Sequence, residues 1–304
     1  MDILDFSEEI KNFRHNGVTL NLDERMQIDM ALNTLLARVE TEELSFWGKI
    51  EGIKNDYYIA MGMRFRNMYE FPVKTFFWAL SGEFIFREMP DLTGQHDALI
   101  DADTSYFQGM PTAVLSGKKD IEEEEQAEAA KSENEEEEKE EKAKNSDETS
   151  EEEVKVPTRP LTELDRLTTT VRAIENDCQI CPVGAFKMTP EHQVRRNEAF
   201  NGLNAESGMR LANYLHFRNV QDEAKRAELD LPTAPFNERF LESASVDQPR
   251  GCWSMQKDER GDSVMVRSLQ WPGYQFFHRL NSSRFGAIYV GDGLKNLEIH
   301  FIVQ

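Results

Sequence analysis

An acidic tract in the middle of the chain restricts the fold more than any other feature of the sequence. Residues 120–153 contain 18 acidic residues against four lysines, a net charge of −14 over 34 positions, and include two runs of four glutamates. Such a segment has too few apolar side chains to offset the entropy lost on ordering it. We therefore expect a solvated, disordered insert. A partly helical charged arm is the alternative, because Lys and Glu mix at helical spacings between Glu133 and Lys144.

The remaining residues can form a sizeable core. Outside the tract the 304-residue chain has 38 acidic and 31 basic residues, so it carries −7 of the total charge of −21, and it is rich in Phe, Trp and Met. We expect residues 1–117 to hold N-terminal helices and β-hairpins, residues 118–157 to form the insert, and residues 158–304 to hold helices followed by a C-terminal antiparallel β-meander. The two parts that flank the insert are predicted to form one globular unit.

The charge balance and the cysteine count disfavour several classes of protein. A pI near 4.8 without a basic stripe argues against nucleic-acid binding, which depends on clustered Lys and Arg. The N-terminus has acidic residues where a signal peptide has a positive region, and no stretch of 18 apolar residues occurs, so secretion and membrane spanning are disfavoured. Three cysteines make no disulfide framework and indicate a reducing compartment such as the cytosol.

The N-terminal part is predicted to contain two helices. Phe6, Ile10 and Phe13 share one helical face before a stop at Gly17. A second helix can begin after Asn21, whose side chain can cap it together with the side chain of Glu24. The apolar stripe of this second helix is predicted to comprise Met26, Met30 and residues 32–39.

Two β-hairpins of one sheet are predicted to follow. Residues 46–65 are aromatic and β-branched on both sides of a turn at residues 54–56. Residues 74–80 and 83–88 flank Ser81-Gly82 in the same way.

Helices are predicted again after the insert. Pro160 is suited to the first position of a helix that runs to Asp177. One apolar face of this helix is predicted to comprise Leu161, Leu164, Leu167, Val171 and Ile174. Shorter helices are expected at residues 205–217, 222–228 and 236–244.

The last fifty residues have β character and complete the predicted fold class. Up to five strands are predicted, over residues 252–259, 263–269, 274–280, 285–291 and 297–303. In the turn before the last strand, deletion of Lys295 is expected to slip the register of that strand. The order of elements lacks the alternation of a parallel doubly wound sheet. We therefore predict an α+β fold with a mainly antiparallel β-sheet, N-terminal and central helices and a long disordered acidic insert.

The motifs for catalysis or ligand binding are incomplete. Cys178 and Cys181 form a CxxC pair that supplies two of the four ligands of a zinc site, so structural zinc and a redox role are alternatives to ordinary thiols. None of the six histidines falls in a metal-binding pattern, and Gly291 to Lys295 lacks the context of a phosphate-binding loop. We expect no enzyme activity, cofactor or metal. The alternative is a regulatory or nucleotide- or metal-binding enzyme-like protein of the cytosol.

Aromatic residues gather in short blocks that have polar flanks. Strand alternation assigns about half of each block to the core, and the excess can line partner surfaces. The residues predicted to serve the fold or subunit contacts are Trp47, Tyr57, Tyr58, Trp253, Trp271, Tyr274 and Lys295.

The blocks resemble the radial spoke head protein 9 family of motile cilia and flagella. The segments that carry the resemblance are FWGKIEGIKNDYYIA (46–60), PRGCWSMQ (249–256), VRSLQWPGYQFFH (266–278) and FGAIYVGDGLKNLEIHF (285–301). FNGLNAESGMRLANYLHFR (200–218) is similar to the family's helix and HFR block in place and order. The resemblance therefore covers nearly the whole chain, although it rests on neither the acidic insert nor the CxxC pair.

The resemblance implies a non-enzymatic structural subunit of the axonemal radial spoke head, the projection from the doublet microtubules toward the central pair. It implies roles in head assembly and mechanical signalling, and a location in the cytoplasm, the cytoskeleton and the axoneme of the cilium or flagellum. The implied partners are spoke head proteins of the 4 and 6 types and other head subunits, with transient contact with the central apparatus. Nucleic acid and membranes are not among them, and the family carries no catalytic residues to transfer.

Overall fold

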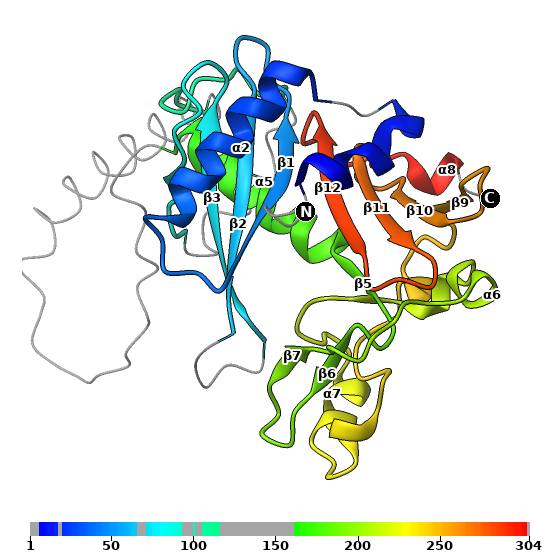
Figure 1. Cartoon of the computed structure of the whole chain (residues 1–304). Helices are drawn as coiled ribbons and strands as arrows, with labels where there is room; N and C mark the ends of the chain where they lie inside the picture. Colours follow the sequence, from blue (N-terminus) through cyan, green and yellow to red (C-terminus); the bar gives the residue numbers. More distant parts are fainter. Residues whose placement is uncertain are drawn as a thin grey trace, which may run out of the picture.

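An eight-stranded sheet organises the computed structural model (Figure 1). The structure describes residues 6–17, 20–65, 71–92, 100, 105–115 and 161–302. The predicted insert at residues 118–157 and the predicted helix start at Pro160 lie outside these ranges. The fold is α+β with a mainly antiparallel sheet and with N-terminal and central helices, which confirms the predicted class.

The first half of the sheet comes from the N-terminal part of the chain and has the order β4-β3-β2-β1. Its strands are β1 (Glu43–Ile50), β2 (Tyr57–Arg64), β3 (Val73–Leu80) and β4 (Arg87–Glu88). Both predicted hairpins form, because β1 pairs antiparallel with β2 and β3 with β4. The second hairpin is shorter than predicted. Phe84 takes a positive φ of 50°, and its N–H bonds back to the Leu80 carbonyl at 3.2 Å, which extends the turn.

The second half of the sheet is a four-stranded antiparallel meander at the C-terminus. Its strands are β9 (Trp253–Lys257), β10 (Ser263–Ser268), β11 (Tyr274–Arg279) and β12 (Phe285–Gly291). The fifth strand predicted at 297–303 is wrong, because Ile299–Ile302 forms the short helix α8. The edge of β12 that this strand would have used is occupied by β1. The predicted register slip on deletion of Lys295 is therefore wrong as well.

A parallel seam between β1 and β12 joins the two halves. Gly48 pairs with Tyr289, Lys49 with Val290 and Ile50 with Gly291. A β-carbon on Gly48 would lie 2.1 Å from the Tyr289 carbonyl oxygen, so the seam requires glycine at this position. The paired strands lie at opposite ends of the sequence, and no local pattern predicts their contact.

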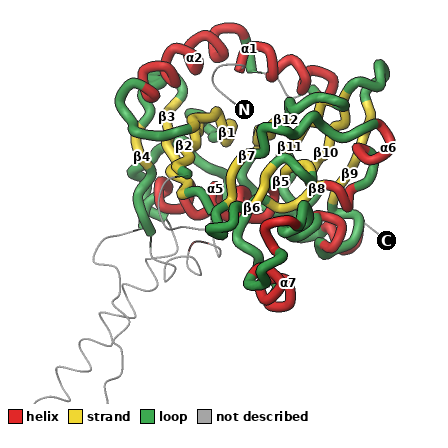
Figure 2. Tube along the Cα trace, turned by 60° about the horizontal axis from the view of Figure 1, so that its bottom comes forward, coloured by secondary structure: helices red, strands yellow, loops and turns green. Residues whose placement is uncertain are grey.

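The N-terminal helices cover one face of the sheet. They are α1 (Phe6–Glu9), the 3-10 helix η1 (Ile10–Asn16) and α2 (Leu22–Leu36), and Figure 2 shows α1 and α2 on the side of the strands opposite to α5. Phe6 packs on Phe46 of β1 and Phe13 packs on Phe277 of β11, each with ring centroids 5.3 Å apart. Phe6, Ile10 and Phe13 are buried, as their spacing predicts. These helices therefore contact both halves of the sheet.

The orientation of α2 confirms one prediction and corrects another. Its N-terminus has the predicted capping box between Asn21 and Glu24. The apolar stripe predicted for α2 is wrong at Met26 and Met30, which are 57% and 61% exposed, and is confirmed at Leu32 and Leu35, which are buried. The residues that face the sheet are Ile28, Leu32 and Leu35. The sequence of α2 contains two competing apolar stripes, and the one with β-branched and leucine side chains is buried.

Helix α5 (Glu163–Cys178) covers the other face, together with short elements from the middle of the chain (Figure 2). These are β5 (Ile180–Pro182), β6 (Phe186–Met188), β7 (Val194–Arg196), α6 (Ala205–Gly208), η4 (Leu211–Asn213), β8 (Tyr214–His216), α7 (Glu223–Leu229), η5 (Ala234–Phe236) and η6 (Ala244–Val246). β5 pairs with β8, and β6 pairs with β7.

Two of the three short helices predicted in this region need correction. Of the helix predicted at 205–217, the first turn forms α6, but residues 214–216 form β8 because they pair with β5. The helix predicted at 236–244 is wrong. Residues 237–243 form a turn and then an isolated bridge from Ser243 to Leu215 of β8, and the Glu242 carbonyl accepts from the His216 N–H at 2.8 Å. The helix predicted at 222–228 is confirmed as α7.

Candidate functional site

Helix α5 forms the centre of the candidate site. Thr162 and Asp165 make a capping box at its N-terminus, which satisfies backbone N–H groups that otherwise lack partners. Leu167, Val171 and Ile174 are fully buried against the sheet, as their spacing predicts. The helix therefore has a rigid position from which its polar side chains can act.

Glu175 connects α5 to the first half of the sheet. Its carboxylate accepts hydrogen bonds from the Trp47 indole N–H of β1 at 2.9 Å and from the Lys74 ammonium of β3 at 2.6 Å. Lys74 also donates to the Phe217 carbonyl at 3.1 Å. Because Glu175 is 4% exposed, these contacts are shielded from water and are strong.

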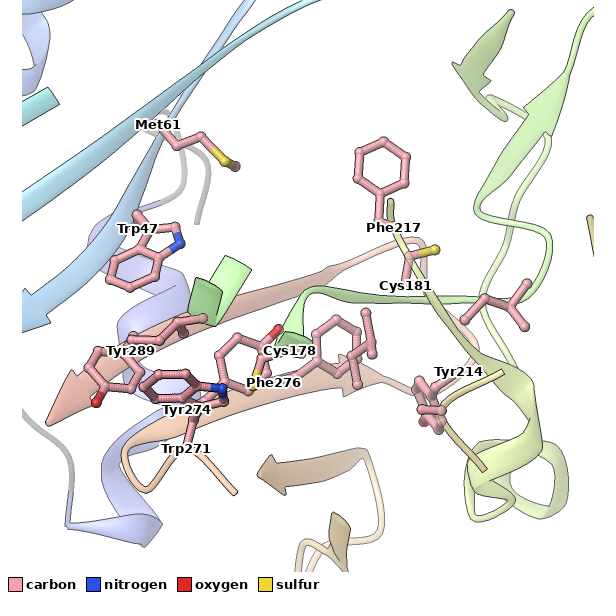
Figure 3. Packing of buried hydrophobic residues seen from close by; sticks show 14 of the residues in the cluster. Trp47, Met61, Cys178, Cys181, Tyr214, Phe217, Trp271, Tyr274, Phe276 and Tyr289 are labelled. Atoms are coloured by element: carbon pink, nitrogen blue, oxygen red, sulfur yellow. The ribbon is translucent and has the colours of Figure 1, made fainter. Parts of the chain in front are cut away.

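The end of α5 connects to the second half of the sheet. Asp177 accepts from the Trp271 indole N–H and from the Lys295 ammonium, each at 3.0 Å. Gln179, which follows the helix, accepts from the Tyr274 hydroxyl of β11 at 3.3 Å. Figure 3 shows Trp271 and Tyr274 in one cluster with Trp47, although they come from opposite halves of the sheet. The last turn of α5 therefore holds both halves.

Glu163, at the start of α5, fixes a loop at the end of the first hairpin. Its carboxylate accepts from the Tyr57 hydroxyl at 2.5 Å and from the backbone N–H groups of residues 108–110 at 2.8 to 3.0 Å. Burial and the adjacent Glu163 carboxylate raise the pKa of Tyr57 well above its usual value. The Tyr57 hydroxyl is therefore a permanent donor in this contact. We call Glu163, Glu175 and Asp177 the α5 clamp.

Two of the predicted aromatic residues lie away from the α5 clamp. Tyr58 faces the N-terminal helices and donates to Glu24 of α2 at 2.7 Å. Trp253 donates to Asp247 at 2.8 Å, and the same carboxylate lies 2.8 Å from Nε2 of the buried His216. All six predicted aromatic side chains are thus buried and use their polar atoms inside the protein. Lys295, with a side chain 40% exposed, is the one that reaches the surface.

Sequence reasoning missed the acidic partners of the aromatic residues. Acidic residues are so abundant in this chain that no single one stands out. The signal lay in spacing, because Glu163, Leu167, Val171 and Glu175 recur every four residues and therefore share one helical face. An acidic residue on the apolar face of a helix needs a buried partner, and indole and phenol donors of the aromatic blocks supply it.

Comparison with known proteins identifies the family. The sequence model described as "Radial spokehead-like protein" matches residues 1–205, which include β1 to β7 and α5. The chain belongs to this radial spokehead-like family. It is 31% identical over 293 residues to the radial spoke head protein 9 homolog of Danio rerio, and 27% identical over 303 and 297 residues to those of Bos taurus and Homo sapiens. Each alignment covers 95% of both chains.

A cavity of about 290 Å³ lies where this family member's two half-sheets separate beyond the seam. Its wall is mixed: the apolar side chains are Trp47, Met61, Cys181, Phe186, Phe217 and Phe285, and polar residues such as Glu43, Gln179 and Arg196 line it as well. Burial raises the pKa of the Cys181 thiol to about 12, so this thiol is neutral at physiological pH and a weak nucleophile.

The two other cysteines are also buried as free thiols. Burial raises the pKa of Cys252 to about 11 and that of Cys178 further still, so both keep their protons. Within the described ranges, no group of three His, Cys, Asp or Glu side chains is placed to hold a metal ion. No helix in that same part of the chain is long and apolar enough to cross a membrane.

Proposed function

We propose that the chain is a non-enzymatic structural subunit of the axonemal radial spoke head. The observation that carries this proposal is the 31% identity with a radial spoke head protein 9 homolog over 95% of both chains, since identity over whole chains includes core and surface alike. We place the protein in the axoneme of a cilium or flagellum. Its proposed partners are spoke head proteins of the 4 and 6 types and other head subunits, with transient contact with the central apparatus.

The α5 clamp supports a mechanical role in head assembly and in signalling between the central pair and the doublet microtubules. A part that transmits force must keep its shape when load arrives from one side. Here the seam makes the sheet continuous, and Glu175 and Asp177 hold opposite halves of it from one helix turn. Load on either half therefore passes through directional hydrogen bonds to carboxylates, which are buried at Glu175 and partly buried at Asp177.

The partner contacts are proposed to use exposed apolar side chains, because the predicted aromatic residues are internal. Leu22, Met26 and Met30 recur every four residues on the outer side of α2, and they are 63%, 57% and 61% exposed. We call these three residues the outer stripe of α2. Flexible methionine side chains adapt to a partner surface, which suits a subunit contact.

Native axonemal extract tests the proposal. A tagged copy of the chain should elute from size exclusion only within a large assembly that contains the spoke head subunits. The double variant Met26→Gln/Met30→Gln should lower incorporation, and Gln27→Ala, an exposed change on the same helix, should not. Elution as a free chain in extract that keeps intact spoke heads would contradict the proposed function.

A further inference from the structure

The second half of the sheet ends in a strand with one open side. β9 is the last strand in the order of the sheet, and it pairs with β10. At the opposite end of the sheet, β4 has only two residues, whereas β9 has five. Long edge strands are templates for further pairing, and proteins usually protect them with proline, bulges or shortness. β9 contains no proline, and its register with β10 runs without a shift.

The backbone groups on the open side of β9 can be assigned from the hydrogen bonds at its two ends. Cys252 accepts from the Leu269 N–H at 2.8 Å, and the Asp258 N–H donates to Ser263 at 2.9 Å. Since bonding alternates along an antiparallel strand, every second residue between these two also bonds to β10. The N–H and C=O groups of the remaining residues therefore point away from the sheet; these residues are Trp253, Met255 and Lys257.

These outward groups have no partners in the part of the chain that the structure describes. None of the backbone hydrogen bonds among described residues involves the N–H or C=O of Met255 or Lys257 outside the ladder with β10. Lys257 is exposed and Met255 is half-buried, so a second strand can approach at this point. The edge is thus able to accept one more strand by main-chain pairing.

We propose that β9 pairs antiparallel with β9 of a second copy of this chain, with Met255 on the two-fold axis. The outward residues are symmetric about Met255, so every outward N–H meets an outward C=O of the other copy, giving about six hydrogen bonds. Trp253 lies opposite Lys257 of the second copy, and Ser254 lies opposite its Gln256. No like charges face each other in this register.

A second copy is the occupant that fits because the outward backbone groups of the strand are complementary to themselves and the register places no like charges opposite each other. The polar face of β9, with exposed Ser254 and Gln256, makes a polar pair across the axis. The pairing joins two eight-stranded sheets into one continuous sheet. It goes beyond the proposed function and stands without it, because it depends on the edge of the sheet alone.

Sedimentation of the full chain tests the proposal with a matched pair of variants. Met255→Pro removes an outward N–H and no bond to β10, so it should turn the dimer into a monomer or weaken the dimer at least tenfold. Met255→Thr keeps the N–H and should remain dimeric. A wild-type chain that stays monomeric at all concentrations, or a dimer that Met255→Pro leaves unchanged, would overturn the proposal.

Cysteine cross-linking gives an independent readout that does not depend on the proline variant. At the axis, paired Cα atoms lie about 5.5 Å apart, which a disulfide can bridge. Met255→Cys should therefore form an intermolecular disulfide under mild oxidation. Gln256→Cys should not, since the two copies of this residue would be offset along the strands beyond disulfide reach. The three native cysteines are buried and do not interfere. Equal cross-linking of both variants would contradict the register.

Discussion

The two faces of the sheet are covered by helices of different character. On one face, α5 places Glu163, Glu175 and Asp177 where aromatic and lysine donors from both halves of the sheet meet them. On the other face, α2 buries aliphatic side chains, and Glu24 in its first turn accepts from the Tyr58 hydroxyl and the Lys49 ammonium of the sheet.

The two faces therefore contribute differently to the fold. The apolar α2 face mainly stabilises it, whereas the polar α5 face fixes the relative position of the two half-sheets. Apolar burial is roughly proportional to area and tolerates small shifts of a helix over a sheet. Hydrogen bonds to a buried carboxylate depend on distance and angle, so they fix how the halves sit relative to each other. Losing one partner of such a contact also leaves a buried charge without compensation, which makes the α5 face the more sensitive one.

Removal of the Glu175 carboxylate should give the largest effect. Glu175→Ala leaves the Lys74 ammonium and the Trp47 indole without their acceptor, and we expect a loss of about 3 kcal/mol in the free energy of unfolding. Urea denaturation measures it. Asn176→Ala, an exposed change on the same helix turn, is the control and should cost far less. Equal losses for the two variants would show that the buried contacts of Glu175 add no more to the free energy of unfolding than an exposed residue of the same turn.

On the α2 face, the effect should depend on which stripe is changed. Leu32→Ala opens a cavity under a fully buried side chain and should cost about 2 to 4 kcal/mol. Met30→Ala, two residues earlier on the outer stripe, should change stability by less than about 0.5 kcal/mol. Thermal melting of both variants distinguishes the stripes. A larger loss for Met30→Ala than for Leu32→Ala would contradict the burial of Leu32 and the exposure of Met30.

The contacts of Glu24 on the α2 face should make part of the free energy of unfolding depend on pH. Burial alone would raise the pKa of Glu24 above 4.5, but hydrogen bonds from Tyr58 and the Asn21 N–H, together with the charge of Lys49, lower it below that value. A lowered folded-state pKa adds stability above about pH 4.5, and this contribution disappears as the pH falls through the folded-state pKa. The gap in unfolding free energy between wild type and Glu24→Gln should therefore shrink from about pH 6 to about pH 3. A gap that stays constant would exclude the linkage.

Lys295 should show the smallest effect. Its ammonium bonds Asp177 and lies 5.5 Å from the centre of the Trp271 ring, but its side chain is 40% exposed and screened by solvent. Lys295→Ala should cost less than about 1 kcal/mol. Denaturation in low and high salt measures this loss of unfolding free energy. A loss as large as that of Glu175→Ala would show that the contact between Lys295 and Asp177 stabilises the protein as much as the buried contacts of Glu175.

Local patterns in the sequence predicted the local structure well. The capping box at Asn21, the turn at residues 54–56 and the buried face of α5 depend on residues close in sequence, and each forms. The failures come from contacts between distant segments. The segment at 297–303 alternates like a strand, but β1 occupies the edge it would need.

The candidate site shows the same division. Aromatic blocks mark the donors because Trp and Tyr are rare and conspicuous in a sequence. The acceptors of three of them, Trp47, Tyr57 and Trp271, lie on α5, as much as 128 residues away in the case of Trp47 and Glu175. In a chain with 56 acidic residues, only the fold decides which of them meet an indole or a phenol.

Hydrogen exchange of the full chain in increasing urea tests most directly whether α5 joins the two halves into one unit. Amides in β2 and in β11 belong to opposite halves of the sheet, and both are buried. We predict that these amides lose protection at the same urea concentration through one global opening. Glu175→Ala should lower the free energy of opening by the same amount for β2 and for β11. If β11 exchanged through a separate opening at lower urea while β2 stayed protected, the halves would be independent and the clamp would not join them.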